Sequence, residues 1–204
     1  MTGPGSRDRG QVLPFYVAMM ACLLFAAFVF VVVGMAGAKR SDAQGAADAA
    51  ALAAARETRD NLLVGMDLLT LTPADWKDIL DGDRLNPNGA CAKAHDFAAS
   101  NGATAECSAG VLRFTVTTET DKSIGDTVIP GTEDRKGHAS ATAVIEPRCE
   151  LQPGSTPTAT PSPSATPGPV AIDCRGSGVV TVNPSTPGPL TKLARQFFNV
   201  RLIN

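Results

Sequence analysis

Disulfide formation is the chemistry that this sequence most clearly offers. Four cysteines lie in the polar part of the sequence: Cys91, Cys107, Cys149 and Cys174. An even number of cysteines without a CxxC pair is typical of a disulfide framework, and four cysteines allow three connectivities. We favour a bridge between Cys149 and Cys174, because these residues flank a proline-rich stretch and would tie the C-terminal tail back. The other pair, Cys91 and Cys107, is 16 residues apart. Each bridge would contribute about 3 kcal/mol by restricting the unfolded chain.

The sequence offers little material for catalysis. Its two histidines, His95 and His138, have no partner motif, and no phosphate-binding glycine loop, nucleophile elbow or HExxH motif occurs. Cys22 lies in an apolar run and is interpreted as a small apolar residue in lipid. We therefore expect no enzymatic activity, no cofactor and no metal site. With 204 residues and a formal net charge of -2, the chain also lacks the clustered positive charge of proteins that bind nucleic acid.

An uncharged stretch of 29 residues separates Arg9 from Lys39. As a helix it would be about 43 Å long, whereas the hydrocarbon core of a bilayer is about 30 Å thick. A cleaved signal peptide is the alternative, because residues 36–38 (Ala-Gly-Ala) have the small-x-small form of a cleavage site. The apolar region of a signal peptide is only about 7 to 15 residues long. We therefore favour a retained transmembrane helix over residues 12–38, preceded by a short cytoplasmic segment, residues 1–11.

The positive-inside rule does not settle the orientation of this helix, because basic residues flank both ends. Arg7 and Arg9 precede the helix, and Lys39, Arg40 and Arg56 follow it. Disulfide-forming cysteines favour an oxidising compartment for the C-terminal part. We therefore expect a single-pass protein of the cell membrane with an extracytoplasmic C-terminal domain.

An alanine-rich segment, residues 39–60, follows the membrane run without a proline. Alanine is the strongest helix former, so the membrane helix is expected to continue through this segment. Small residues recur on the helix, and with one acidic residue they form a candidate packing interface for another helix: Gly34, Ala38, Gly45, Asp48, Ala49 and Ala53. The alternative is that alanine serves helix propensity only. Asp48 is interpreted either as a solvated residue or as a partner for a basic group across an interface.

Two short helices are expected in the domain that follows. Residues 72–75 (Thr-Pro-Ala-Asp) have the pattern of a capped N-terminus, and this helix should end near Gly82. Its buried stripe would consist of Trp76, Ile79 and Leu80. A second helix is predicted over residues 90–100, with Gly102 as its terminator and Phe97 as its largest apolar anchor.

Strands are predicted where apolar residues alternate with polar ones. This pattern occurs over residues 112–117 and 139–146, and the small alanine face of the second stretch suggests close packing under a helix. Residues 179–182 also have the composition of a strand. Apolar residues then follow helical spacing over 190–197 and alternate over 198–202, so the tail has apolar surface to bury.

The predicted fold class is α+β. A long N-terminal transmembrane helix extends into an Ala-rich helix and is followed by a small disulfide-stapled extracytoplasmic domain, residues 61–151. Residues 152–169 contain six prolines and no hydrophobic pattern, which is typical of an extended linker. The C-terminal segment, residues 170–204, is expected to dock back on the domain.

Residues 9–56 resemble the N-terminal segment of the Tad (tight adherence, Flp) pilus-assembly proteins of the TadE/TadG-like group. Two stretches carry the resemblance: Arg9-Gly10 before the apolar run and residues 43–53 (AQGAADAAALA) after it. The resemblance covers about a quarter of the chain. It implies a bitopic, pseudopilin-like or pilus-assembly protein with a short cytoplasmic start and an external domain.

Gly10 is a candidate processing site in this comparison. Prepilin peptidase substrates of the system have a Glu-Tyr pair at the fifth and sixth positions after the glycine, and here these positions hold Phe15 and Tyr16. The tyrosine matches and the glutamate does not, which is unlike a major pilin subunit. The sequence resembles the TadG-related branch, without the large von Willebrand domain that some members carry.

Two functions are weighed. The first is a non-enzymatic, single-pass component of Tad-type pilus assembly or secretion that acts through helix packing in the membrane. Its expected partners are the lipid bilayer and other pilus-assembly membrane proteins or pilus subunits, in homo- or hetero-oligomers formed through the N-terminal helix. The alternative is a membrane-anchored extracellular binding or adhesion module whose helix is a passive anchor. A secreted enzyme with a cleaved signal peptide has little support.

Overall fold

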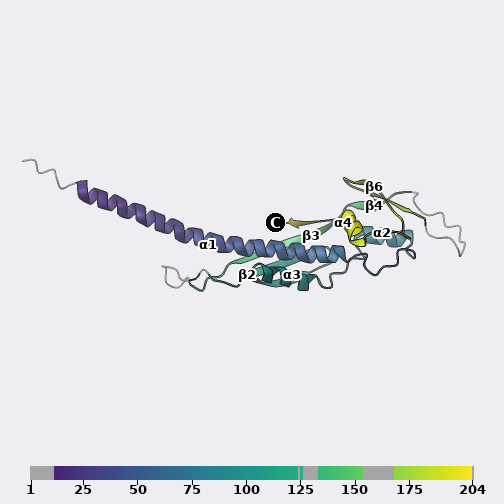
Figure 1. Ribbon diagram of the computed structural model, residues 1–204, viewed down its shortest axis with the longest axis horizontal. Coiled ribbons are helices and arrows are strands. Elements are labelled where there is room, and N and C mark those ends of the chain that lie inside the picture. The colour runs from purple at the N-terminus through teal and green to yellow at the C-terminus, as the bar shows by residue number, and fades with distance from the viewer. Residues whose placement is uncertain (1–11, 124, 126–132, 154–167, 204) are drawn as a thin grey trace, which may run out of the picture.

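A single long helix dominates the computed structural model, which describes residues 12–123, 125, 133–153 and 168–203. This helix, α1 (Val12–Asp60), has 49 residues and is therefore about 73 Å long. Its first half projects away from the rest of the molecule, and its second half lies along a small α+β domain (Figure 1). The predicted fold class, including the continuation of the apolar helix through the alanine-rich segment, is confirmed.

Two antiparallel sheets form the β part of the domain. The first has the strand order β1-β2-β3-β7 and the second the order β4-β5-β6. The strands of the first sheet are β1 (Ala103–Ala109), β2 (Arg113–Thr120), β3 (His138–Pro147) and β7 (Phe198–Ile203). Those of the second are β4 (Cys149–Leu151), β5 (Val170–Cys174) and β6 (Gly178–Val182). Because β7 comes from the C-terminal tail and pairs with β3, the tail completes the first sheet, as its apolar pattern indicated.

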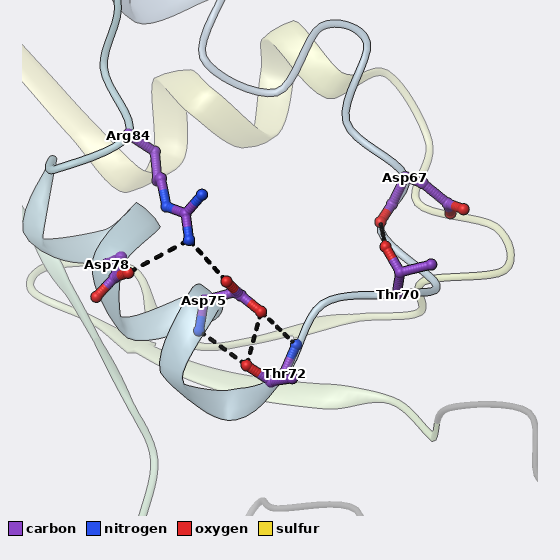
Figure 2. A network of polar contacts seen from close by, with 6 residues as sticks. All are labelled: Asp67, Thr70, Thr72, Asp75, Asp78 and Arg84. Atoms are coloured by element: carbon purple, nitrogen blue, oxygen red, sulfur yellow. Dashed lines mark hydrogen bonds and ion pairs between the residues drawn. The ribbon is translucent and has the colours of Figure 1, made fainter.

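Helix α2 (Pro73–Asp81) begins and ends where the sequence predicts. The Thr72 hydroxyl accepts a hydrogen bond from the amide of Asp75 at 3.2 Å, and the Asp75 carboxylate accepts one from the amide of Thr72 at 3.0 Å. Figure 2 shows this capping box together with Arg84, whose guanidinium lies 2.7 Å from the Asp75 carboxylate. Gly82 ends the helix with a φ of 91°, a left-handed conformation that favours glycine. The predicted stripe of Trp76, Ile79 and Leu80 is buried.

Helix α3 (Ala90–Ser100) packs on α1 through small residues. Ala90, Ala94 and Ala98 are fully buried, and α1 is the main neighbour of this helix. Phe97, the predicted anchor, is instead 41% exposed, and the Lys93 ammonium lies 5.9 Å from the centre of its ring. That prediction is wrong because the close approach of two alanine surfaces leaves no room for an aromatic ring between the helices.

The first sheet also packs closely against α1, with small side chains among those on its inward face. On β3 the inward residues are Ala141, Ala143 and Ile145, and on β2 they include Phe114 and Val116, all of them buried. Both strands contact α1 extensively. The predicted close packing of the alanine face of β3 under a helix is therefore confirmed.

Helix α4 (Leu190–Phe197) leads directly into β7 and connects the tail to the far end of α1. Phe197 and Phe198 are fully buried at this transition. The guanidinium of Arg195 donates to the carboxylate of Asp60, the last residue of α1, at 2.7 Å, and Arg59 donates to the same carboxylate at 2.8 Å. Burial would raise the pKa of Asp60, but the hydrogen bonds and charges of Arg195 and Arg59 outweigh it and lower the pKa.

We expect Asp60→Asn to lower the free energy of unfolding by about 1 kcal/mol at neutral pH, since a partly exposed ion pair is seldom worth more. A lowered folded-state pKa means that the carboxylate stabilises the fold above its unfolded pKa, and that this contribution is lost as the pH falls through the folded pKa. Thermal unfolding of the full chain in detergent micelles, followed by circular dichroism, should show a difference from the native chain that shrinks in acid. A difference that persists unchanged in strong acid would contradict the ionic origin.

Candidate functional site: the junction of the long helix with the domain

The first half of α1 presents its apolar side chains outward. None of the residues whose burial is described between Leu13 and Ala38 is buried, and Phe30 is 84% exposed. Leaving large apolar side chains in water costs about 1.5 to 3 kcal/mol each, so this surface requires an apolar environment. Within the described part of the chain, Leu13–Asp60 is the one helix long and apolar enough to cross a membrane by length and composition.

The domain lies against α1 directly after the apolar run, at Lys39. The backbone of Gly137, which precedes β3, is buried against the backbone of Lys39. A Cβ atom at position 137 would overlap the Lys39 carbonyl oxygen and would lie 3.2 Å from the Cβ of Ala43. Close approach of two backbones therefore explains the glycine at this position.

Two threonines at the end of β2 complete this junction. The buried hydroxyl of Thr118 donates to the carbonyl oxygen of Ala43 at 2.9 Å. Two hydrogen bonds of 2.9 Å join Thr120 and Gly137. The Thr120 amide donates to the Gly137 carbonyl oxygen, and the Gly137 amide donates to the Thr120 hydroxyl. The end of the β2-β3 pair is thus fixed to the first turns of α1 that follow the apolar run, and helix and domain should move together.

A cavity of about 490 Å³ opens beside this junction. One wall is α1 between Lys39 and Ala46, and a second is the turn Asn101–Gly102 after α3. The third is formed by Thr120, the last residue of β2, and the two residues that follow it, Asp121 and Lys122. Among the described residues, the ionisable side chains that line it are Lys39, Asp42, Asp121 and Lys122. The cavity therefore combines two ammonium and two carboxylate groups at the boundary between the apolar and polar halves of α1.

The candidate packing residues of α1 are divided between two faces. Gly34, Ala38 and Gly45 are exposed, and nothing lies within 4 Å of a Cβ atom built at Gly45. Asp48 and Ala49 are half-buried, and Asp48 accepts a hydrogen bond from the Gln44 side chain at 2.8 Å. Ala53, by contrast, is buried within the domain. Among these residues, only those up to Ala49 remain accessible to a partner.

Both favoured disulfides are present. Cys91–Cys107 connects α3 to β1, and Cys149–Cys174 joins β4 to β5 at directly paired positions. Cys22 is a free, exposed cysteine on the apolar half of α1.

The two histidines lie apart. His95 is exposed on α3, and His138 Nδ1 lies 3.6 Å from the carboxylate of Glu119 on the open face of the sheet. Gly10, the candidate processing site, and most of the predicted Pro-rich linker fall outside the described residues.

The junction residues Thr118 and Gly137 were not singled out from the sequence. A glycine directly before an alternating strand is a weak signal for close backbone approach. Nothing in the sequence indicates that its neighbour is Lys39, 98 positions earlier.

These features define a class of protein: a small α+β domain built around the second half of an N-terminal helix whose first half suits a bilayer. Residues 10–57 match the sequence profile of the family described as putative Flp pilus-assembly TadE/G-like. This match confirms the resemblance of the N-terminal segment to that family. The match supports a role in Flp pilus assembly. No curated protein and no solved structure matches the chain.

Proposed function

We propose that this protein is a non-enzymatic, single-pass membrane component of Flp pilus assembly, of the TadG-related branch. The observation that carries the proposal is the continuity of α1, which runs without interruption from an exposed apolar half into the core of the domain. A passive anchor needs only a tether. Here the domain is fixed to the helix at Lys39 and again at Ala43, so a partner that moves the helix also moves the domain.

The proposed topology places residues 1–11 in the cytoplasm and the α+β domain outside. Two disulfides in the domain support this orientation, because such bonds persist in oxidising compartments and are rare in the cytosol.

The outward face of α1 supports a contact with another membrane protein. Gly34, Ala38 and Gly45 are all exposed, although Gly45 also lines the cavity beside the junction. Small residues allow the backbones of two helices to approach closely in lipid. We expect this face to pack against a pilus-assembly membrane protein, a pilus subunit or a second copy of this chain.

Gly45→Leu should leave the fold intact and reduce assembly. Open space surrounds Gly45, and leucine raises helix propensity by close to 1 kcal/mol relative to glycine. The added bulk would nevertheless prevent close helix contact, so crosslinking to assembly partners and the amount of assembled pilus should fall several-fold. Both are measured in cells that produce the full-length variant.

Gly45→Ala is the matched control, because it gives a similar gain in helix propensity while keeping the residue small. It should leave crosslinking and pilus output unchanged. Native output and native crosslinking in the leucine variant would argue against an assembly interface on this face and favour the binding-module alternative.

A further inference from the structure

In the proposed topology, the cavity beside the junction begins where the apolar run ends, next to the lipid headgroups. Its α1 wall begins at Lys39, the first charged residue after the apolar run, and ends at Ala46. This wall covers about 10 Å of helix. The headgroup layer of a bilayer is roughly 5 to 7 Å thick on each side of a 30 Å hydrocarbon core. This placement rests on the proposed function, in which residues 12–38 cross the membrane.

The charges in the cavity are balanced. The Lys39 ammonium and the Asp42 carboxylate are 4.0 Å apart and form only a loose ion pair on α1. Asp121 and Lys122 face the same space from the end of β2, and both are exposed. A simple anion would pair with the two lysines and leave two carboxylates close to its own charge, which is unfavourable. A ligand with both a negative and a positive group suits this lining better.

We propose that the cavity binds the headgroup of a phospholipid that carries a phosphate and a primary ammonium, as in phosphatidylethanolamine. The phosphate would pair with Lys39 and Lys122, and the ammonium with Asp42 and Asp121. A primary ammonium donates hydrogen bonds to carboxylates, whereas the quaternary ammonium of phosphatidylcholine has no N–H to donate. The volume is many times what one water requires, so the headgroup enters with room for ordered water.

Bound at this site, the lipid would hold the end of the β2-β3 pair at the membrane surface. Lys39 and Asp42 belong to α1. Asp121 and Lys122 directly follow β2, whose end is already held against α1 by Thr118 and Gly137. A headgroup between them adds ionic contacts across the same junction and sets the height of the domain above the bilayer.

Lipid retention by the full chain tests this inference. The protein is incubated in detergent with equal amounts of phosphatidylethanolamine, phosphatidylcholine and phosphatidylglycerol, and the lipids that remain bound are measured by native mass spectrometry. We expect the native chain to retain phosphatidylethanolamine several-fold over each of the other two. Equal retention of all three lipids, or a preference for phosphatidylglycerol, would overturn the proposal.

The double variant Asp42→Asn with Asp121→Asn should lose the preference over phosphatidylcholine and retain more phosphatidylglycerol, because the lining becomes cationic. The matched control, Asp96→Asn with Asp173→Asn, also removes two exposed carboxylates but lies outside the cavity, and it should keep the native ratio. An unchanged preference in the first variant would also overturn the inference.

Flotation with vesicles separates this test from that of the proposed function. A native chain that floats with the membrane but shows no lipid preference contradicts the headgroup site alone. A chain that does not float contradicts the membrane anchor itself.

Discussion

Gly137→Ala is expected to lower the free energy of unfolding by about 3 kcal/mol, at the upper end of what overpacking usually costs. The added Cβ would overlap the carbonyl oxygen of Lys39 and come within 2.9 Å of its carbonyl carbon. Both are backbone atoms of a regular helix and cannot rotate away as a side chain would. The strand end must therefore move off α1, which also weakens the buried hydrogen bond from Thr118 to Ala43.

Gly45→Ala makes the same substitution at an uncrowded position of α1 and serves as the comparison. Nothing lies within 4 Å of a Cβ atom there, so alanine should stabilise the helix by about 1 kcal/mol. Thermal unfolding of both full-length variants in detergent micelles measures the difference. Equal stability of the two variants would show that helix and domain are not in close backbone contact at position 137.

Loss of this contact should also affect assembly if helix and domain act as one body. Gly137→Ala leaves the apolar run, residues 12–38, and the exposed face of α1 unchanged, so membrane insertion is expected to stay native. What changes is the coupling between the helix and the sheet, through Lys39 and Ala43. The variant therefore distinguishes membrane anchoring from the transmission of helix movement to the domain. The proposed function requires this transmission.

Much of the fold could be predicted because its signals are local. The capping box at Thr72 and Asp75, and the left-handed glycine at Gly82, fix both ends of α2 within a few residues of chain. Alternation of apolar and polar residues likewise indicated β2 and β3. Each of these patterns depends on hydrogen bonds or side-chain directions that the backbone itself determines.

Three strands were missed: β4, which has only three residues, and β1 and β5, in which an alternating pattern is present. In β1 the inward residues are Ala105, Cys107 and Ala109, whose small size gives little hydrophobic contrast with their neighbours. In β5, Val170 and Ile172 alternate with less apolar residues over only five positions. Short segments with weak contrast are hard to distinguish from loops by period alone.

The direction of the alanine-rich face could not be predicted for a different reason. Alanine occupies so many positions between residues 43 and 55 that no side of the helix is markedly more apolar than another. The structure buries Ala50 and Ala54 completely against the domain and leaves Gly45 exposed. Only the tertiary contacts of α1 with α3 and the sheet determine which side of the helix is buried. The contacts with the sheet also create the junction at Gly137.

Removal of the Cys149–Cys174 disulfide should be the other large effect. Cys149→Ala with Cys174→Ala opens a loop whose ends are 25 residues apart, and restriction of such a loop in the unfolded chain contributes roughly 3 to 4 kcal/mol. Both cysteines are buried, and β4, which holds one of them, has only three residues. Without the bridge, few backbone hydrogen bonds keep the second sheet paired across its long connection.

The matched variant, Cys91→Ala with Cys107→Ala, should lose less stability. Its loop spans 16 residues, and both cysteines are only half-buried. It also joins α3 to β1, two elements that already contact each other extensively and that follow one another in the chain. Thermal unfolding of each full-length variant under non-reducing conditions gives the order. A larger loss for the Cys91–Cys107 variant would mean that α3 and the first sheet depend more on their disulfide than the second sheet does.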